Sequence, residues 1–266
     1  MTNELTLLKL GGSLITDKDK PYTPRPDKLA ELASEIKAAL DTNPGLLLIL
    51  GHGSGSFGHV AAKKYGTRNG VQTHEQWVGF SEVRFQAAEL NRFVMESLVK
   101  AGVPAVSFPP SASMISDNRK VVRHNVETMR KALGVHLLPV VYGDVAFDET
   151  LGGTILSTED VFAFLVEEFA PARILLAGME AGVWEDFPAR KRLVKQIQLP
   201  AYEKMRAGIG GSTSTDVTGG MKAKVEEMLA LIQKNRSLTV QIFSAEKPGS
   251  LSRALSGENM GTLLTV

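Results

Sequence analysis

The sequence predicts an α/β fold, in which helices cover a mainly parallel sheet and two lobes form one continuous domain. Short apolar runs typical of buried strands alternate along the chain with amphipathic segments typical of helices. No stretch rich in Pro or Ser divides the chain, and no internal repeat is visible. The 266 residues suffice for a well-buried core in one large domain or in two small lobes.

The expected strands and helices follow one another in a regular order. Helices are predicted where apolar residues recur every three or four positions, with Asp27 as the N-cap of the first helix and Gly102 closing the second. The expected elements are strand 5–10, a helix opening at Pro26, strand 46–50, a helix from Glu75 to about Lys100, strands 105–108, 138–142 and 173–177, a helix from Gly219 to about Gln233, and strands 238–243 and 261–266.

One break interrupts this pattern. Paired acids and paired glycines disturb the apolar alternation near residues 145–155. We therefore expect a single domain over residues 1–266, with an N-terminal lobe of about 1–150 and a C-terminal lobe of about 151–266.

The composition disfavours several classes of protein and site. Thirty Lys and Arg against 29 Asp and Glu leave a net charge of +1. The protein therefore has no overall positive potential that would attract nucleic acid or an anionic membrane. The absence of cysteine excludes disulfides, thiolate catalysis and zinc–thiolate sites. No apolar stretch approaches about 18 residues and the N-terminus lacks a basic n-region, so neither a spanning helix nor a signal peptide is expected. These features fit a cytoplasmic protein.

The first of three glycine-rich turns ends the first strand. Lys9-Leu10-Gly11-Gly12-Ser13 places a lysine beside exposed backbone N–H groups and a hydroxyl, and Thr16 and Lys18 follow. That combination suits phosphate oxygens. Taken alone, an ordinary turn with a surface lysine explains it equally well.

The second turn is the most informative stretch of the chain. Residues 51–59 read Gly-His-Gly-Ser-Gly-Ser-Phe-Gly-His directly after the second strand, so the backbone must approach something closely. Gly53-x-Gly55-x-x-Gly58 satisfies the dinucleotide fingerprint, but that fingerprint belongs in the first βαβ unit, with an acid about 20 residues later. Here the residues at that distance lead into a helix. Dinucleotide binding is therefore disfavoured.

The third turn begins the helix expected near the C-terminus. Gly219-Gly220 opens that helix, and Lys224 lies within its first two turns, where free N–H groups favour a nucleotide phosphate. A capped helix with solvated lysines is the plain alternative. Together, however, three glycine-rich turns, two of them with a nearby lysine, favour a polyphosphate site. Neither a Walker motif nor the protein-kinase signatures occur, so the architecture must be another one.

These motifs, in this order, resemble the amino acid kinase superfamily. They are Lys9-x-Gly11-Gly12-Ser13 with Lys18, the 51–59 loop, and residues 216–221, which read Asp-Val-Thr-Gly-Gly-Met. Within the superfamily, Ser56-Phe57-Gly58-His59 resembles the isopentenyl phosphate kinases most closely. The resemblance runs from residue 5 to the C-terminus and implies a three-layer αβα sandwich and a homodimer.

The resemblance implies ATP-dependent phosphorylation of isopentenyl phosphate to isopentenyl diphosphate, in an alternative mevalonate route of isoprenoid biosynthesis. The acceptor would occupy the N-terminal lobe and the nucleotide the C-terminal lobe. Lys9, Lys18 and His59 would be catalytic, and Ser54, His59 and Glu159 would hold the substrate. The residues implied for the nucleotide are Lys9, Gly11, Gly12, Ser13, Gly55, Gly178, Gly220 and Lys224.

The sequence departs from the family pattern at two places. Ser157-Thr158-Glu159, followed by Asp160, stands where the family has Ser-Gly-Asp, and Glu159 aligns best. Residues 178–184 read Gly-Met-Glu-Ala-Gly-Val-Trp, without the two aspartates that the family commonly carries there. The acid that acts and the adenine and ribose contacts are therefore left open.

The chemistry agrees with this resemblance. A phosphate monoester is already nucleophilic, so catalysis can rest on positioning and charge neutralisation. Mg²⁺ is expected to bind mainly to the phosphate oxygens of ATP, because no cluster of His, Asp or Glu in the sequence has the spacing of metal ligands. His59 can donate a charge-assisted hydrogen bond to a phosphate, whereas His52 is expected to order the loop.

Other features bear on the acceptor. The helix after the loop carries Phe80, Val83 and Ala87, some of which are expected to wall an apolar pocket for a five-carbon tail. Two alternatives remain: a kinase of the same fold for another small phosphate or phosphonate such as fosfomycin, and a non-catalytic nucleotide-binding protein. The latter predicts that Lys9 and Lys18 are dispensable.

Overall fold

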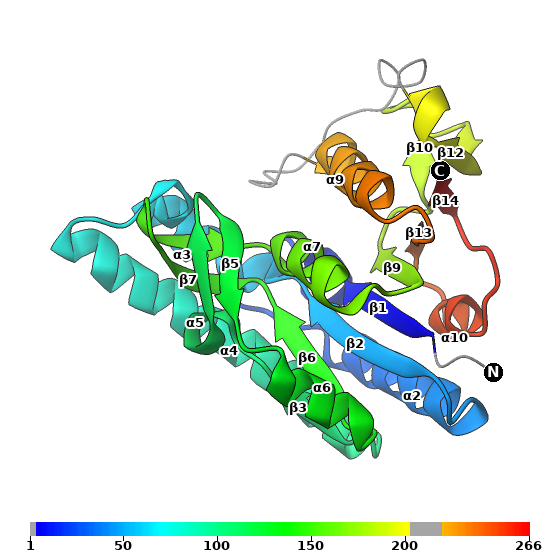
Figure 1. Ribbon diagram of the computed structural model, residues 1–266, viewed down its shortest axis with the longest axis horizontal. Helices are drawn as coiled ribbons and strands as arrows, with labels where there is room; N and C mark the ends of the chain where they lie inside the picture. The colour runs from blue at the N-terminus through cyan, green and yellow to red at the C-terminus, as the bar shows by residue number, and fades with distance from the viewer. Residues whose placement is uncertain (1–3, 203–219) are drawn as a thin grey trace.

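An eight-stranded sheet forms the middle of the molecule in the computed structural model, which describes residues 4–202 and 220–266 (Figure 1). Of His59 it describes the backbone but not the side chain. The strand order is β12-β14-β13-β9-β1-β2-β6-β3. The strands are β1 Leu5–Leu10, β2 Leu47–His52, β3 Ala105–Ser107, β6 Leu138–Tyr142, β9 Arg173–Gly178, β12 Gln196–Gln198, β13 Thr239–Ser244 and β14 Thr262–Thr265.

The sheet is mainly parallel, as predicted. Every neighbouring pair runs parallel except β13 with β14. Leu7 and Leu8 of β1 are both fully buried, on opposite faces, because successive side chains of a strand point to opposite sides. A strand buried on both faces needs a continuous apolar run, which is how these strands read in the sequence.

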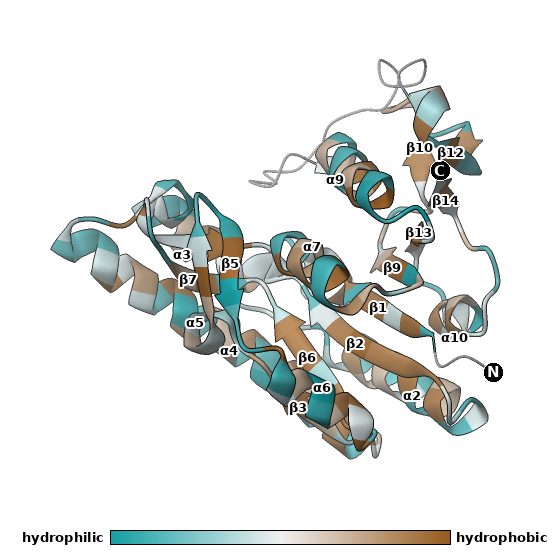
Figure 2. Ribbon diagram, in the orientation of Figure 1, coloured by the Kyte–Doolittle hydropathy of each residue, from teal (hydrophilic) through white to brown (hydrophobic). Residues whose placement is uncertain are grey.

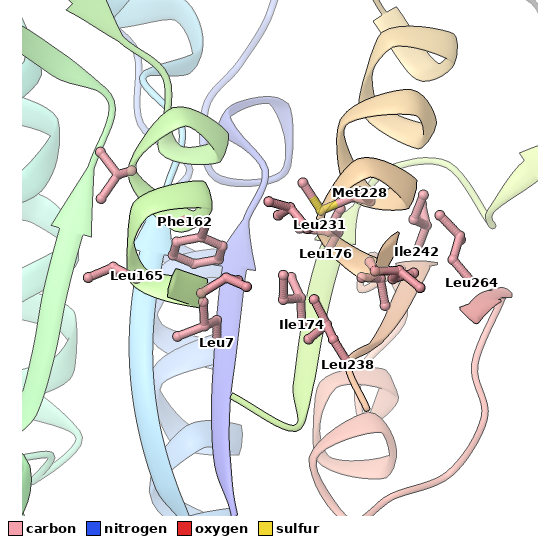
Figure 3. Packing of buried hydrophobic residues seen from close by; sticks show 14 of the residues in the cluster. Leu7, Phe162, Leu165, Ile174, Leu176, Met228, Leu231, Leu238, Ile242 and Leu264 are labelled. Carbon is pink, nitrogen blue, oxygen red and sulfur yellow. The ribbon is translucent and has the colours of Figure 1, made fainter. Parts of the chain in front are cut away.

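Helices cover both faces of the sheet and complete three layers (Figure 1). One layer consists of α6 Glu127–Gly134, α7 Thr158–Phe169 and α9 Gly220–Lys234. Figure 3 shows Phe162 and Leu165 of α7 beside Leu7, and Met228 and Leu231 of α9 over β9. The other layer consists of α2 Pro26–Thr42, α4 His74–Lys100 and α10 Ser250–Leu255. The predicted α/β class is confirmed.

Hydropathy follows these layers. In Figure 2 the strands β1, β2 and β6 are drawn mostly in hydrophobic colours, whereas the helices that cover them mix hydrophobic and hydrophilic residues. This is the amphipathic pattern by which the helices were predicted. In the parts of the chain that are described, no helix combines the length and apolar character needed to cross a bilayer.

A second sheet of four strands lies beside the start of α4 (Figure 1). Trp77 and Phe80 of α4 contact Phe147 of this sheet, with ring centroids 5.8 and 5.3 Å apart. Its order is β5-β4-β7-β8, with β4 Met114–Asp117, β5 Lys120–His124, β7 Asp144–Asp148 and β8 Gly152–Leu156. Residues 145–155 thus belong to the antiparallel β7–β8 hairpin. The division into two lobes near this point stays a prediction.

Several helices were not predicted, among them α6 and α10 as well as α3 and α7. α3 Gly55–Tyr65 begins inside the glycine-rich loop, and α7 occupies a stretch where no element was predicted. The predicted N-cap of α2 was wrong: Arg25 is the N-cap, because Pro26 takes the first helical position and Asp27 lies in the first turn. The remaining short elements are α1 Gly12–Ile15, η1 Thr67–Asn69, α5 Pro110–Ser113, β10 Val183–Trp184, β11 Leu193–Val194 and η2 Leu199–Ala201.

The carboxyl ends of the central strands meet at one edge of the sheet. Leu10 at the end of β1 lies opposite His52 of β2 on one side and Ala177 of β9 on the other. His52 in turn lies opposite Tyr142 of β6. β1 lies between two strands: β2, which is the next strand in the sequence, and β9, which comes much later in the chain. The strand order therefore changes direction at β1. Open α/β sheets bind ligands at such a switch point, outside the carboxyl ends of the strands.

Candidate active site

A cavity of about 800 Å³ opens at this edge of the sheet. It is lined by the turns after β1 and β2, the start of α7, the residues after β9 and the start of α9. Among the predicted site residues that line it are Lys9, Gly11, Gly12, Ser13, Lys18, Ser54, Gly55, Glu159, Gly178, Gly220 and Lys224.

Two predicted features lie partly outside the described residues. His59 is on α3, and its side chain lies outside the described part of the structure. Of the third glycine-rich turn, residues 215–219 lie outside the described residues, and the structure places the turn from Gly220 onward.

Lys9 and Glu159 form an ion pair on the floor of the cavity. Lys9 is only 8% exposed, and its Nζ donates to Oε1 of Glu159. The Nζ of Lys224 on α9 lies 4.0 Å from the same oxygen. Burial alone would raise the pKa of Glu159, but the charges of Lys9 and Lys224 outweigh it and lower the pKa to about 2. The ionised carboxylate therefore holds two cations from distant parts of the chain together.

The first turn of α7 puts Glu159 in this place. Ser157 is the N-cap, and its hydroxyl accepts the N–H of Asp160, whose carboxylate accepts the N–H of Ser157 at 2.7 Å. Asp160 also accepts from Nη1 of Arg68 at 3.3 Å. The two adjacent acids thus have separate partners: Asp160 caps the helix, and Glu159 lines the cavity and pairs with Lys9.

The glycine-rich turns after β1 and β2 pack directly against each other. A Cβ on Gly12 would lie 2.3 Å from the backbone N of Gly55, and a Cβ on Gly53 would lie 2.9 Å from the N of Gly12. Gly55 has a φ of 49°, and a Cβ there would lie 2.2 Å from Oγ1 of Thr16. These glycines are therefore required by the contact between the two turns, before any ligand is considered.

The interlocked turns leave several backbone donors free. Over residues 4–202 and 220–266, no acceptor contacts the N–H groups of Gly12, Ser13, Ser54 or Gly55. All four residues line the cavity. Converging free N–H groups form a concave anion site, since each can donate to a phosphate oxygen.

His52 belongs to the scaffold beneath the second turn. Its ring stacks on Tyr142 with centroids 5.2 Å apart, and burial lowers its pKa to about 4. Nδ1 lies 3.2 Å from the carbonyl of Gly53, and Nε2 lies 3.2 Å from the amide of Asn91, which also contacts Ser107. Because the atom of Asn91 that faces Nε2 is its Oδ1, a neutral ring donates one of the two hydrogen bonds, either from Nδ1 to Gly53 or from Nε2 to Asn91. In either case His52 lies beneath the Gly53 peptide.

The residues after β9 form another part of the cavity wall. Glu180 accepts from Nε1 of Trp184 at 3.0 Å and from Nη2 of Arg190 at 2.7 Å. Gly178 faces open space, because no described atom lies within 4 Å of a Cβ built there. Where the family pattern has aspartates, this chain thus presents one glutamate held by an indole and a guanidinium.

Several charged residues of the cavity were missed in the sequence, among them Asp144, Arg68 and Lys63. Asp144 is 1% exposed and accepts the N–H of Ser111 at 3.2 Å, and burial raises its pKa. Arg68 donates to the carbonyl of Ile155 at 3.1 Å as well as to Asp160. Lys63 follows His59 by one turn of α3. The Gly-Asp pair at the end of a buried strand was a usable signal for Asp144, whereas α3 itself had to be known before Lys63 could be placed.

The apolar wall expected for a substrate tail is present in part. Val83 and Ala87 of α4 line the cavity, together with Ile155 of β8. Phe80 is 8% exposed and does not line the cavity, because it packs against Trp77 and the second sheet. Cationic and apolar surfaces therefore share one cavity.

Comparison with known proteins agrees with this geometry. The model of the amino acid kinase family matches residues 4–244. The chain is 34% identical to the isopentenyl phosphate kinase of Methanocaldococcus jannaschii, over 97% of each chain. It is 33% identical to that of Methanothermobacter thermautotrophicus, over 98% of this chain and 99% of the relative. A solved isopentenyl phosphate kinase superposes with a TM-score of 0.82 at 31% identity, over 98% of this chain and 100% of that one. The chain belongs to the amino acid kinase family, and it is similar to isopentenyl phosphate kinases along nearly its whole length.

Proposed function

We propose that this protein transfers the γ-phosphoryl group of ATP to isopentenyl phosphate, giving isopentenyl diphosphate and ADP. One observation carries the proposal: a single cavity combines Lys9, Lys18 and Lys224 with free backbone N–H groups and with an apolar wall from α4. The cations and N–H groups suit polyphosphate, and the apolar wall suits a short hydrocarbon tail. The relatives named as isopentenyl phosphate kinases support the same substrate.

The chemistry needs little more than positioning. An oxygen of the acceptor phosphate attacks the γ-phosphorus of ATP, and the bond from that phosphorus to the β–γ bridging oxygen breaks, so that ADP leaves. The acceptor is already an anion, and no strong base is required. Catalysis then rests on holding two anionic phosphates in line and neutralising the charge that develops between them.

We propose separate roles for the residues around these phosphates. Lys9 and Lys18 neutralise the transferring group, and Ser54 and His59 hold the phosphate of the acceptor. Glu159 acts through Lys9, because its carboxylate is engaged by that lysine on the cavity floor. The remaining proposed contacts are to the phosphates of ATP and come from Gly11, Gly12, Ser13, Gly55, Gly178, Gly220 and Lys224.

Mg²⁺ enters this scheme with ATP. In the described part of the chain, no three His, Cys, Asp or Glu side chains are grouped so that they could hold a metal ion. The phosphate oxygens of ATP are the hard ligands that Mg²⁺ prefers. When bound, the ion neutralises charge on the β- and γ-phosphates.

We further propose that the protein is cytoplasmic, since the proposed donor ATP is supplied in the cytoplasm. We also propose that it forms a homodimer. Val78, Phe85 and Val99 are exposed on α4, and Val106 is exposed on the edge strand β3. The three positions on α4 are seven and fourteen residues apart, so they share one side of the helix, and a continuous exposed apolar surface marks a contact between proteins. Light scattering should give twice the mass of one chain, and Phe85→Glu should shift it toward the monomer.

A side-by-side assay tests the substrate. ADP formation from Mg-ATP is measured with isopentenyl phosphate, dimethylallyl phosphate, fosfomycin and acetylglutamate as acceptors. The proposal predicts turnover with an isoprenoid phosphate. Turnover of fosfomycin or acetylglutamate without either isoprenoid phosphate would overturn it, and no turnover at all would favour a non-catalytic nucleotide-binding protein.

The role of His59 has its own test. His59→Ala should lower kcat/KM by about 100-fold, because a charge-assisted donor to the phosphate is lost, and the melting temperature should stay unchanged. His136→Ala, at an exposed position, is the matched control. A His59→Ala enzyme with wild-type kcat/KM would remove this histidine from the site.

A further inference from the structure

The hydroxyl of Thr16 lies where three segments of the site meet. It donates to the carbonyl of Gly12 in the first glycine-rich turn at 2.8 Å. It also accepts the N–H of Ser56 in the second turn at 3.0 Å. Thr16 is 1% exposed, so water cannot replace either bond. One buried hydroxyl thus joins the two turns that carry the free N–H groups.

Ser56 continues this connection to the loop that bears Lys18. Its hydroxyl accepts the N–H of Thr23 at 3.3 Å, and its carbonyl accepts the N–H of Tyr22 at 3.4 Å. Ser56 is 8% exposed. The far side of the loop is therefore attached to the start of α3.

The base of the same loop is closed next to Thr16. Thr16 pairs with Pro24 in an isolated bridge, and the N–H of Asp17 donates to the carbonyl of Thr23 at 2.9 Å. Lys18 itself is exposed at the rim of the cavity. Among the described residues its ammonium has no ion-pair partner, so the backbone of the loop sets where it lies.

We propose that Thr16 and Ser56 are positioning residues for phosphoryl transfer: their hydroxyls lock the two glycine-rich turns together and hold the Lys18 loop over the cavity. This inference rests on the proposed function, in which Lys18 neutralises the transferring group. Thr16 does not line the cavity, and it acts on the reaction through the position of Lys18. A displacement of about 1 Å at such a site can cost about 100-fold in rate.

A double-mutant cycle tests this coupling. Thr16→Val keeps the shape but removes both hydrogen bonds, and it should lower kcat by about 10- to 100-fold with smaller changes in either KM. Thr16→Ser keeps the hydroxyl and should restore most of kcat. In a Lys18→Ala background, Thr16→Val should cost much less than in the wild type. An equal cost in both backgrounds would overturn the proposal.

A second measurement is independent of the substrate. Amide hydrogen exchange of the free protein should rise in Thr16→Val at residues 17–23 and 53–58, because Ser56 loses the acceptor of its N–H. Thr6→Val is the matched control, a fully buried threonine on β1 whose hydroxyl contacts Arg173 away from the cavity. Unchanged exchange in both segments would contradict the lock even if the proposed acceptor proved wrong.

Discussion

The floor and the rim of the cavity are built in opposite ways. On the floor, Lys9 is buried, paired with Glu159 and joined there by Lys224. On the rim, Lys18 is exposed on a loop that hydrogen bonds attach to its neighbours. Both lysines are proposed to serve the same phosphoryl group.

The difference separates stability from activity. Removing Lys9 leaves the buried carboxylate of Glu159 with Lys224 alone, 4.0 Å away, so we expect a loss of stability somewhat below the roughly 3–5 kcal/mol of a fully unpaired buried charge, in addition to any loss of catalysis. Removing a rim charge leaves nothing buried behind, so its cost should appear in the reaction alone.

Lys9→Ala should have the largest effect. We expect kcat to fall about 1000-fold, more than KM changes, because the interaction strengthens as charge develops, and we expect thermal unfolding at a clearly lower temperature. Lys9→Met combined with Glu159→Gln removes both buried charges, so it should recover stability without recovering activity. Wild-type stability in Lys9→Ala would show that the floor pair does not matter to the fold.

His52, which lies beneath the second glycine-rich turn, should make the stability of the protein sensitive to acid. Burial lowers the pKa of His52 from 6.5 to about 4. Between these two pH values the imidazole is protonated in the unfolded chain and neutral in the folded protein. Stability from this residue is complete above pH 6.5 and is lost as pH falls toward 4, by up to about 3 kcal/mol.

Denaturant unfolding across this pH range measures the effect. His52→Gln should remove the loss of stability that this residue causes between pH 6.5 and about 4.5. The difference between the variant and the wild type isolates it from Glu227, whose pKa burial raises to about 7 and whose contribution has the opposite sign. His136→Gln, at an exposed histidine, should keep that loss. An unchanged loss of stability in His52→Gln would contradict the buried neutral ring.

Gly178→Ala should give the smallest effect, on the nucleotide alone. The fold has room for a methyl group there, since no described atom lies within 4 Å, so stability should be unchanged. If ATP approaches this backbone, its KM should rise about 10-fold, or about 1.4 kcal/mol, while the KM of the acceptor stays the same. Gly134→Ala, which also meets no described atom, is the control; equal KM values for ATP would place the nucleotide elsewhere.

The central strands could be predicted because buried parallel strands carry continuous apolar runs with little ambiguity. α3 could not, since its sequence begins Gly-Ser-Phe-Gly-His and has low helix propensity. The helix exists because its first residues are locked against Thr16 and Gly12 and its body packs on α4. α7 did leave a readable signal, the capping box of Ser157 and Asp160.

The site divides in the same way. The glycine-rich turns and their lysines indicate a phosphate site, and this signal can be recognised from short stretches of sequence. The meaning of the glycines was only partly predictable, because Gly12 and Gly55 meet each other across 43 residues. Arg68 was missed for the same reason: its partners at Ile155 and Asp160 are distant in sequence.

Lys18 on the rim offers a direct measurement of the proposed phosphoryl transfer. Formation of isopentenyl diphosphate from Mg-ATP and isopentenyl phosphate is followed by phosphorus NMR for the wild type and Lys18→Ala, with thermal unfolding of both. We predict that the wild type makes the diphosphate and that Lys18→Ala makes it about 100-fold more slowly at saturating substrates, with an unchanged melting temperature. A wild-type protein that makes no diphosphate, or a Lys18→Ala variant that is equally fast, would contradict the account.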